Sequence, residues 1–308
     1  MLSVSRVLFA ASCLFAPLAA IAQEHPAAIE PATVTDCESF LKSWGFFIEL
    51  TKGGKIEPID GGCHGTHLYF VLNPSMRWLF EDMRVTGTDL FLSATENRLP
   101  DALEATATGM RFSQTVSSPN LSYQLRALQR TNDIHLSYRW DRHSRDLLLH
   151  DFSWVNRQFG SFSLSGAMSN LSELPPLKGK RAQGSDQATI KNVSARLESH
   201  GLFEILVVQA LISKLPWDEE PQPLVERYQL SAKASIDALP EAVASADSKA
   251  ALKTFVASFP HPAGLYELNA ETQPQVSIAE LAKAKDPAAL MELFNRIRIS
   301  VTHKRPQE

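Results

Sequence analysis

The feature that most constrains this chain is an alternation of apolar and polar residues, with a period of two, between His67 and Ser199. It is clearest in Ile134-His135-Leu136-Ser137-Tyr138-Arg139-Trp140, where every second residue is aliphatic or aromatic. Alternation over four to eight residues is typical of a β-strand with one buried face. The pattern therefore predicts a half-buried strand over Ile134–Trp140.

Short polar segments separate the alternating segments. Asp141–Asp146 and Asn156–Gly160 are of a length and composition that suit turns. Short connections between consecutive strands indicate an antiparallel meander with one wet face and one dry face, and Leu174–Asp186 is predicted to be a surface loop. The predicted strands are His67–Leu72, Val85–Ala94, Leu103–Phe112, Leu121–Leu125, Ile134–Trp140, Leu147–Val155, Ser161–Met168 and Thr189–Leu197.

The period changes to that of a helix after His200. Pro216 and Pro260 would end two of the helices, Ser248 could cap one of them, and Ser277 and Glu280 form a capping box for a further turn. The predicted helices are Gly201–Leu215, Val225–Leu239, Ser248–Phe259 and one starting at Asp286-Pro287, with strands at Gly264–Ala270 and Arg296–Val301.

These elements predict an α+β fold: a long antiparallel β-meander, shaped as a groove or half-barrel-like sheet, with helices concentrated in the C-terminal third. Residues 35–200 form the expected β-rich region, and residues 201–308 form a helix-rich α+β region closing on the same sheet. A short helix opens the first region, with a capping box at Thr35-Asp36-Cys37-Glu38 and an apolar side formed by Phe40, Leu41 and Trp44, and Gly45 ends it.

The first 22 residues have the pattern of a secretory signal peptide. Arg6 precedes an uncharged apolar run from Val7 to Ile21, and the run ends in Ala20-Ile21-Ala22, which suits cleavage after Ala22. An uncleaved anchor would need about 20 apolar residues, and Pro17 interrupts this shorter run. Cys13 leaves a lipoprotein as a further alternative.

Cleavage predicts an exported protein without a transmembrane segment, periplasmic as the first choice and secreted as the second. Residues 23–34 are rich in Pro and Ala and are expected to form a flexible leader. Without Arg6 the chain keeps 29 basic and 34 acidic residues, a net charge of −5. Nucleic-acid binding calls for a basic domain, so the composition argues against it.

Two cysteines, Cys37 and Cys63, remain after cleavage. In an oxidising compartment an isolated pair indicates a disulfide, which would close a loop of about 26 residues and contribute about 3 kcal/mol. Two free thiols are the alternative.

Cys63-His64-Gly65-Thr66-His67 has residue types that bind metal ions. A cysteine in a disulfide cannot supply a thiolate, so His64 and His67 would remain as the only ligands of this segment. The competing interpretation is a glycine-rich turn leading into a strand.

His135, His143, His150 and Asp151 fall around one predicted hairpin, close to several serines. A hydrolase with a nucleophile elbow needs Gly-x-Ser-x-Gly at a strand-to-helix turn, whereas Gly160-Ser161-Phe162-Ser163 places Phe at the nucleophile position. No glycine-rich phosphate loop, Cys-x-x-Cys pair or haem-attachment pattern occurs. No catalytic residue and no cofactor is therefore assigned.

Tyr138, Trp140, Phe152 and Trp154 would lie on the dry face of the meander. Aromatic residues at strand spacing usually form a core, and the alternative is a groove for an apolar ligand.

Val193-Ser194-Ala195-Arg196-Leu197-Glu198-Ser199-His200-Gly201-Leu202 is a strand that breaks at His-Gly into an apolar helix. With the C-terminal order of helix, Pro-containing turn, strand, helix and final strand, it resembles Gram-negative periplasmic proteins of the AsmA-like kind. The resemblance covers Val85 to Val301 and implies runs of amphipathic strands and a lipid-handling role. The chain departs from AsmA itself where a cleaved signal replaces the membrane anchor.

Two functions follow as hypotheses. The first is a non-enzymatic, envelope-associated binding module for an apolar or lipid ligand or a partner protein, bound at the aromatic face. The second is a periplasmic hydrolase or metal-dependent enzyme that uses the His64 and His67 region.

Overall fold

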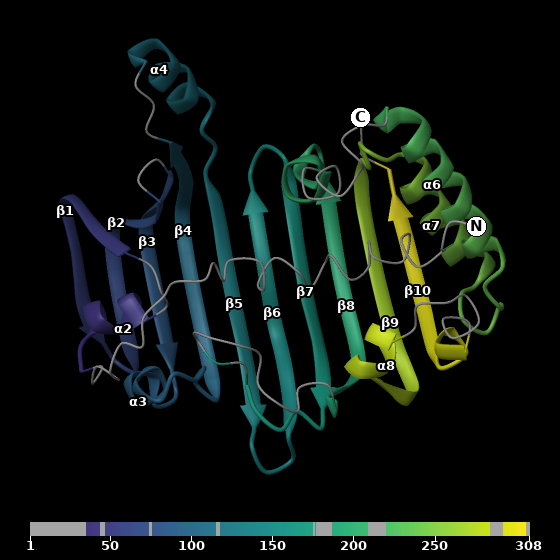
Figure 1. Cartoon of the computed structure of the whole chain (residues 1–308), viewed down its shortest axis with the longest axis horizontal. Helices are drawn as coiled ribbons and strands as arrows, with labels where there is room; N and C mark the ends of the chain where they lie inside the picture. The colour runs from purple at the N-terminus through teal and green to yellow at the C-terminus, as the bar shows by residue number, and fades with distance from the viewer. Residues whose placement is uncertain are drawn as a thin grey trace. The chain divides into compact units, whose positions relative to one another are not determined.

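The computed structural model describes residues 35–43, 47–73, 76–114, 118–174, 176, 187–208, 220–283 and 292–305 (Figure 1). The predicted signal peptide and leader, Trp44, Gly45, the end of the helix predicted after Gly201 and the helix predicted at Asp286 lie outside these residues. No helix within the described residues is long and apolar enough to cross a membrane.

The strands follow one another in chain order as an antiparallel meander, so the predicted α+β meander fold is confirmed. The chain forms two compact units. One contains residues 24–158 and 171–185, and the other contains residues 159–170 and 186–308. The division falls between Gln158 and Phe159, whereas the period of the sequence changes at His200.

The first unit contains six strands and three helices within its described residues, ordered α2, β1, β2, β3, α3, β4, α4, β5 and β6. Each strand pairs with the next in antiparallel register. Their bounds are α2 Cys37–Ser43, β1 Phe47–Ile59, β2 Gly62–Asn73, β3 Met76–Gly87, α3 Leu90–Thr95, β4 Ala102–Gln114, α4 Pro119–Leu128, β5 Asn132–Asp141 and β6 Asp146–Asn156.

The alternation of buried residues shifts phase along β2 and β4. On β2, Cys63 and Gly65 are buried, and the next buried position is Leu68, three residues on. His67 in that step has a positive φ of 51°, and Gly109 on β4 has a φ of 63°. A residue with left-handed backbone angles often marks a bulge, in which one extra residue is inserted into a strand. The shift keeps Leu68 on the apolar side, where its Cδ2 fills the space beside Gly65.

The strand predicted at Leu121–Leu125 is wrong, because these residues lie in helix α4. Pro119 occupies the first helical position, and Ser118 accepts hydrogen bonds from the backbone N–H groups of Leu121 and Ser122. Leu121 and Leu125 are four residues apart, a spacing that fits one side of a helix as well as alternation in a strand.

The strand predicted at Val85–Ala94 is wrong beyond Gly87, where β3 ends. Asp89 takes a left-handed conformation with φ 50°, and α3 then buries Leu90, Ser93 and Ala94. Positions i, i+3 and i+4 form one side of a helix. Strand β1 was not predicted from the sequence, because the Gly53-Gly54 bulge interrupts its alternation.

The cap predicted for α2 is also different. Asp36 accepts a hydrogen bond from Ser39 N–H through its carboxylate at 2.8 Å, and Ser39 Oγ accepts from Asp36 N–H at 3.3 Å. The reciprocal cap therefore joins Asp36 and Ser39 in place of Thr35 and Glu38, because a carboxylate at the N-cap accepts this bond readily.

The second unit contains four strands within its described residues, with β7 to β10 paired in order. The start of the helix predicted at Gly201–Leu215 is present over the described residues 202–208 and includes the π-helical stretch η3. The bounds are β7 Gly160–Ser169, β8 Thr189–Ser199, η3 Glu204–Val208, α6 Pro221–Asp237, α7 Ala246–Ala257, β9 Gly264–Ser277, α8 Ile278–Lys283 and β10 Ile297–Lys304.

Helix α7 packs against β10, and α6 packs against α7 (Figure 1). Aromatic edge-to-face contacts join Phe203 to Phe255 and Phe255 to Tyr266 on β9. The predicted capping box is confirmed at α8, where Glu280 N–H donates to Ser277 Oγ and Ser277 N–H donates to the Glu280 carboxylate. Ser245 caps α7 in place of the predicted Ser248.

Candidate functional site

Cys37 and Cys63 form a disulfide, with a Cα–Cα distance of 5.5 Å. It joins α2 to the start of β2, and both cysteines are buried. A sulfur held in a disulfide cannot act as a thiolate ligand. The Cys63-His64-Gly65-Thr66-His67 segment therefore offers imidazoles alone as possible metal ligands.

His64 and His67 lie in different surroundings. His64 is held between carboxylates of two neighbouring strands, with Nδ1 3.1 Å from Glu57 Oε1 and Nε2 2.6 Å from Asp82 Oδ2. His67 is exposed at the left-handed position of β2. Within the described part of the chain, no group of three His, Cys, Asp or Glu side chains is placed to hold a metal ion.

A similar arrangement joins β4, β5 and β6. His135 Nδ1 lies 2.7 Å from Asp151 Oδ2, and its Nε2 lies 3.8 Å from Glu104 Oε1. A hydrolytic relay would need a serine hydroxyl at the ring nitrogen opposite the aspartate, and Glu104 is the group that faces it. His143 and His150 are exposed, in the β5–β6 turn and on β6 respectively.

Gly160–Ser163 begins strand β7 and does not form a strand-to-helix turn. Phe162 is paired with Leu197 on β8. The segment therefore lacks the geometry that exposes a nucleophile in an elbow.

The aromatic residues singled out in the sequence separate into two pairs. Tyr138 and Trp140 are buried and have their polar atoms bonded: Tyr138 Oη donates to Pro100 O at 3.0 Å, and Trp140 Nε1 donates to Leu171 O at 3.2 Å. Burial raises the pKa of the Tyr138 hydroxyl well above its usual range. These two residues serve the core of the first unit.

Phe152 and Trp154 are only half-buried. Phe152 pairs with Leu136 and Trp154 with Ile134 on β5, and these two residues pair in turn with Ala105 and Ala107 on β4. We call this set of half-buried residues the apolar strip: Ala105, Ala107, Ile134, Leu136, Phe152 and Trp154.

A bulge is needed to bring Phe152 and Trp154 onto the same face as Tyr138. The β5–β6 register shifts between Ser137 and Tyr138, which leaves His150 as the extra residue of β6. Without the bulge, Leu149 and Phe152 would lie on opposite faces of the sheet, because they are three residues apart. The Trp154 ring is fixed by a hydrogen bond from Nε1 to Asn132 Oδ1 at 3.0 Å.

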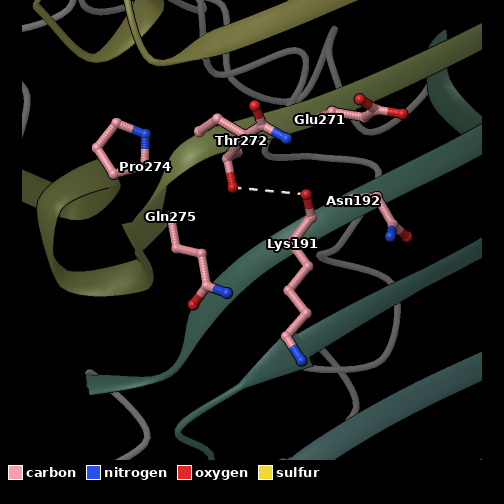
Figure 2. A pocket seen from close by; sticks show the side chains of 7 residues that line it. Lys191, Asn192, Glu271, Thr272, Pro274 and Gln275 are labelled. Atoms are coloured by element: carbon pink, nitrogen blue, oxygen red, sulfur yellow. Dashed lines mark hydrogen bonds between the residues drawn. The ribbon is translucent and has the colours of Figure 1, made fainter.

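The second unit has a polar recess of about 460 Å³ between β8 and β9 (Figure 2). It forms where Lys191 alone on β8 stands opposite Thr272–Gln275 on β9. Thr272 Oγ1 donates to the backbone carbonyl of Lys191, and Gln275 Oε1 accepts from the hydroxyls of Ser169 and Thr189. Several lining groups thus already bond to the protein, and the polar lining does not suit an apolar ligand.

Three of the carboxylates that face His64 and His135 were not singled out from the sequence: Glu57, Asp82 and Glu104. Glu57 alternates with apolar neighbours in Lys55-Ile56-Glu57-Pro58-Ile59, a pattern that could have revealed β1. In comparisons with known proteins, the chain matches no family model and no curated protein.

Proposed function

We propose that this protein is an exported, non-enzymatic binding module whose apolar strip takes one acyl chain of a lipid or fatty acid. The observation that carries the proposal is the register that aligns Ala105 and Ala107, Ile134 and Leu136, and Phe152 and Trp154 across three strands while leaving all six half-buried. Partly exposed apolar residues in one contiguous patch favour an apolar ligand.

The width of the strip favours a slender ligand. Neighbouring strands lie about 4.8 Å apart, so three strands give a strip roughly 10 Å wide. A stable protein interface buries about 800 Å² on each partner, more than six half-buried side chains can offer. The small alanines beside Ile134 and Leu136 would make room for an acyl chain.

Export to the periplasm is part of the same proposal. It is supported by the signal-like residues 1–22 and by the Cys37–Cys63 disulfide, which suits an oxidising compartment. The resemblance to AsmA-like proteins agrees with a lipid ligand. These supports are independent of the apolar strip.

The test is binding of cis-parinaric acid, a fluorescent fatty acid, measured by energy transfer from tryptophan. We expect Ala105→Glu to weaken binding about tenfold or more, because it places a charge on the strip, and tenfold corresponds to ~1.4 kcal/mol. Thr106→Glu is the matched control, because Thr106 is the next residue of β4 and pairs with His135 on the polar face. Thermal unfolding of both variants shows whether the fold persists.

Equal affinity of the wild type and a folded Ala105→Glu variant would contradict the site. Absence of parinaric acid binding by the wild type, and of lipid in native mass spectra of protein purified from the envelope, would contradict the function.

A further inference from the structure

His64 connects three strands through one side chain. It lies on β2, pairs directly with Glu57 on β1 and with Arg84 on β3, and reaches diagonally to Asp82. Both ring nitrogens are within hydrogen-bonding distance of a carboxylate oxygen, at 3.1 Å and 2.6 Å. Its side chain is 15% exposed, so water has limited access to the ring.

Two carboxylates on one imidazole make the arrangement sensitive to protonation. The imidazolium has two N–H donors, whereas neutral imidazole has one donor and one lone pair. A carboxylate has no proton to donate, so in the neutral form either Glu57 or Asp82 must face a lone pair. The observed geometry therefore fits the protonated ring.

The surrounding charges agree with this reading. The hydrogen bond to Asp82 raises the pKa of His64 most, and Glu57 adds to it, while partial burial and Arg84 oppose the increase. The charged groups that face His64 are Lys55 and Glu57 from β1 and Asp82 and Arg84 from β3. Lys55 binds Glu57 at 2.9 Å and so competes for one of the two carboxylates.

Strand β1 depends on the His64 contact more than β2 or β3 does. Among the described strands β1 pairs only with β2, and the pairing is interrupted between Leu50 and Lys55. Glu57 lies in the remaining short run that pairs residues 55–59 with residues 62–66. The disulfide at Cys63 holds β2 to α2, so β2 stays in place if β1 loosens.

The same register row contains a second histidine with the same kind of partners. His64 pairs with Arg84, Arg84 with Thr106, and Thr106 with His135. His135 lies between Asp151 at 2.7 Å and Glu104 at 3.8 Å. Because the His135–Glu104 distance is longer, His135 is bound less firmly between its two carboxylates than His64 is.

We propose that His64 is a pH-dependent latch on strand β1, which fastens β1 through Glu57 to β2 and β3 while the ring is protonated and loosens it when the proton leaves to solvent. The latch does not depend on the ligand proposed for the apolar strip. Its sign follows from linkage: a group with a raised folded pKa contributes stability that is complete below its unfolded pKa and is lost as pH rises through the folded value.

The test is hydrogen exchange of the β1 backbone amides of residues 55–57 and 59 as a function of pH, alongside NMR titration of the His64 ring in the same full-length protein. Protection factors correct for the pH dependence of intrinsic exchange. We expect protection in this segment to fall by up to about fivefold as His64 deprotonates, the size of a partly exposed ion pair. Protection of β3 should stay constant.

His64→Gln removes the charge while keeping one donor and one acceptor, and it should abolish the pH-dependent step in β1. His143→Gln, in the exposed β5–β6 turn, should keep the pH-dependent step in β1. His135→Gln should also leave the pH dependence of protection in residues 55–59 unchanged. A step that persists in His64→Gln would overturn the latch. So would a wild-type step whose midpoint differs from the His64 titration, a comparison that needs no variant.

Discussion

Ser248 Oγ accepts a hydrogen bond from the backbone N–H of Val301 at 3.1 Å, which joins the first turn of α7 to the edge of β10. Ile299 N–H donates to Val243 O at 2.7 Å beside it, in the segment between α6 and α7. Two backbone N–H groups of this edge strand are therefore satisfied by α7 and by the segment that precedes it. Covered edges resist pairing with other chains.

We expect Ser248→Ala to destabilise the protein by about 1–3 kcal/mol, because it leaves the buried Val301 N–H without its acceptor. Ser248 is only 4% exposed, so water cannot easily replace the hydroxyl. Chemical denaturation measures the free energy of unfolding. Ser258→Ala is the control, because Ser258 Oγ bonds to Phe255 O within its own helix end. A loss as large as that of Ser248→Ala would contradict the assignment.

The structural role of the Tyr138 hydroxyl can be tested by removing its oxygen atom alone. We expect Tyr138→Phe to cost about 1 kcal/mol, because Pro100 O loses its hydrogen bond in a buried environment. Tyr123→Phe is the matched control, since Tyr123 is 70% exposed, and it should leave the stability unchanged. The raised pKa of Tyr138 adds a second measurement: ultraviolet titration should show its phenolate absorbance appearing only as the protein unfolds in alkali.

Glu280 should make stability depend on pH in the acid range. The Arg296 guanidinium, followed by the Ser277 N–H and hydroxyl, lowers the pKa of Glu280 from 4.5 to about 2. A group with a lowered folded pKa contributes stability above its unfolded pKa and loses it as pH falls through the folded value. Because the carboxylate is 44% exposed, we expect a contribution of at most about 1 kcal/mol.

The measurement is the difference in unfolding free energy between the wild type and Glu280→Gln as a function of pH. The difference should be constant above about pH 5 and should shrink towards zero as the pH falls from about 4.5 to 2. A double-mutant cycle with Arg296→Gln isolates the ion pair from the capping box. A difference that stays the same throughout this range would show that the ionised carboxylate contributes nothing.

Local patterns predicted the elements whose residues follow one period without interruption. Ile134–Trp140 alternates cleanly and is a strand, and Ser277 and Glu280 form the predicted capping box. Errors fall where one pattern fits two structures or where a bulge breaks it. Leu121–Leu125 suits a helix as well as a strand, and β1 is divided by Gly53-Gly54.

The candidate site was only partly predictable for the same reason. Phe152 and Trp154 are visible as aromatic residues at strand spacing, but their half-buried state depends on neighbours from other strands. Tyr138 and Trp140 look equivalent to these two in the sequence, yet both are buried, with hydrogen bonds to Pro100 and Leu171 respectively. Burial depends on packing between segments that are distant in the chain.

The sequence by itself determined the antiparallel meander, because alternation is a local property, and it predicted the disulfide that the structure forms between Cys37 and Cys63. Only the tertiary structure decided what His64 does. Its partners, Glu57 and Asp82, lie seven and eighteen residues away on opposite sides. The register of β1 and β3 against β2 places both carboxylates on one imidazole. A pairwise register is a property of several strands together, so no single stretch of sequence can specify it.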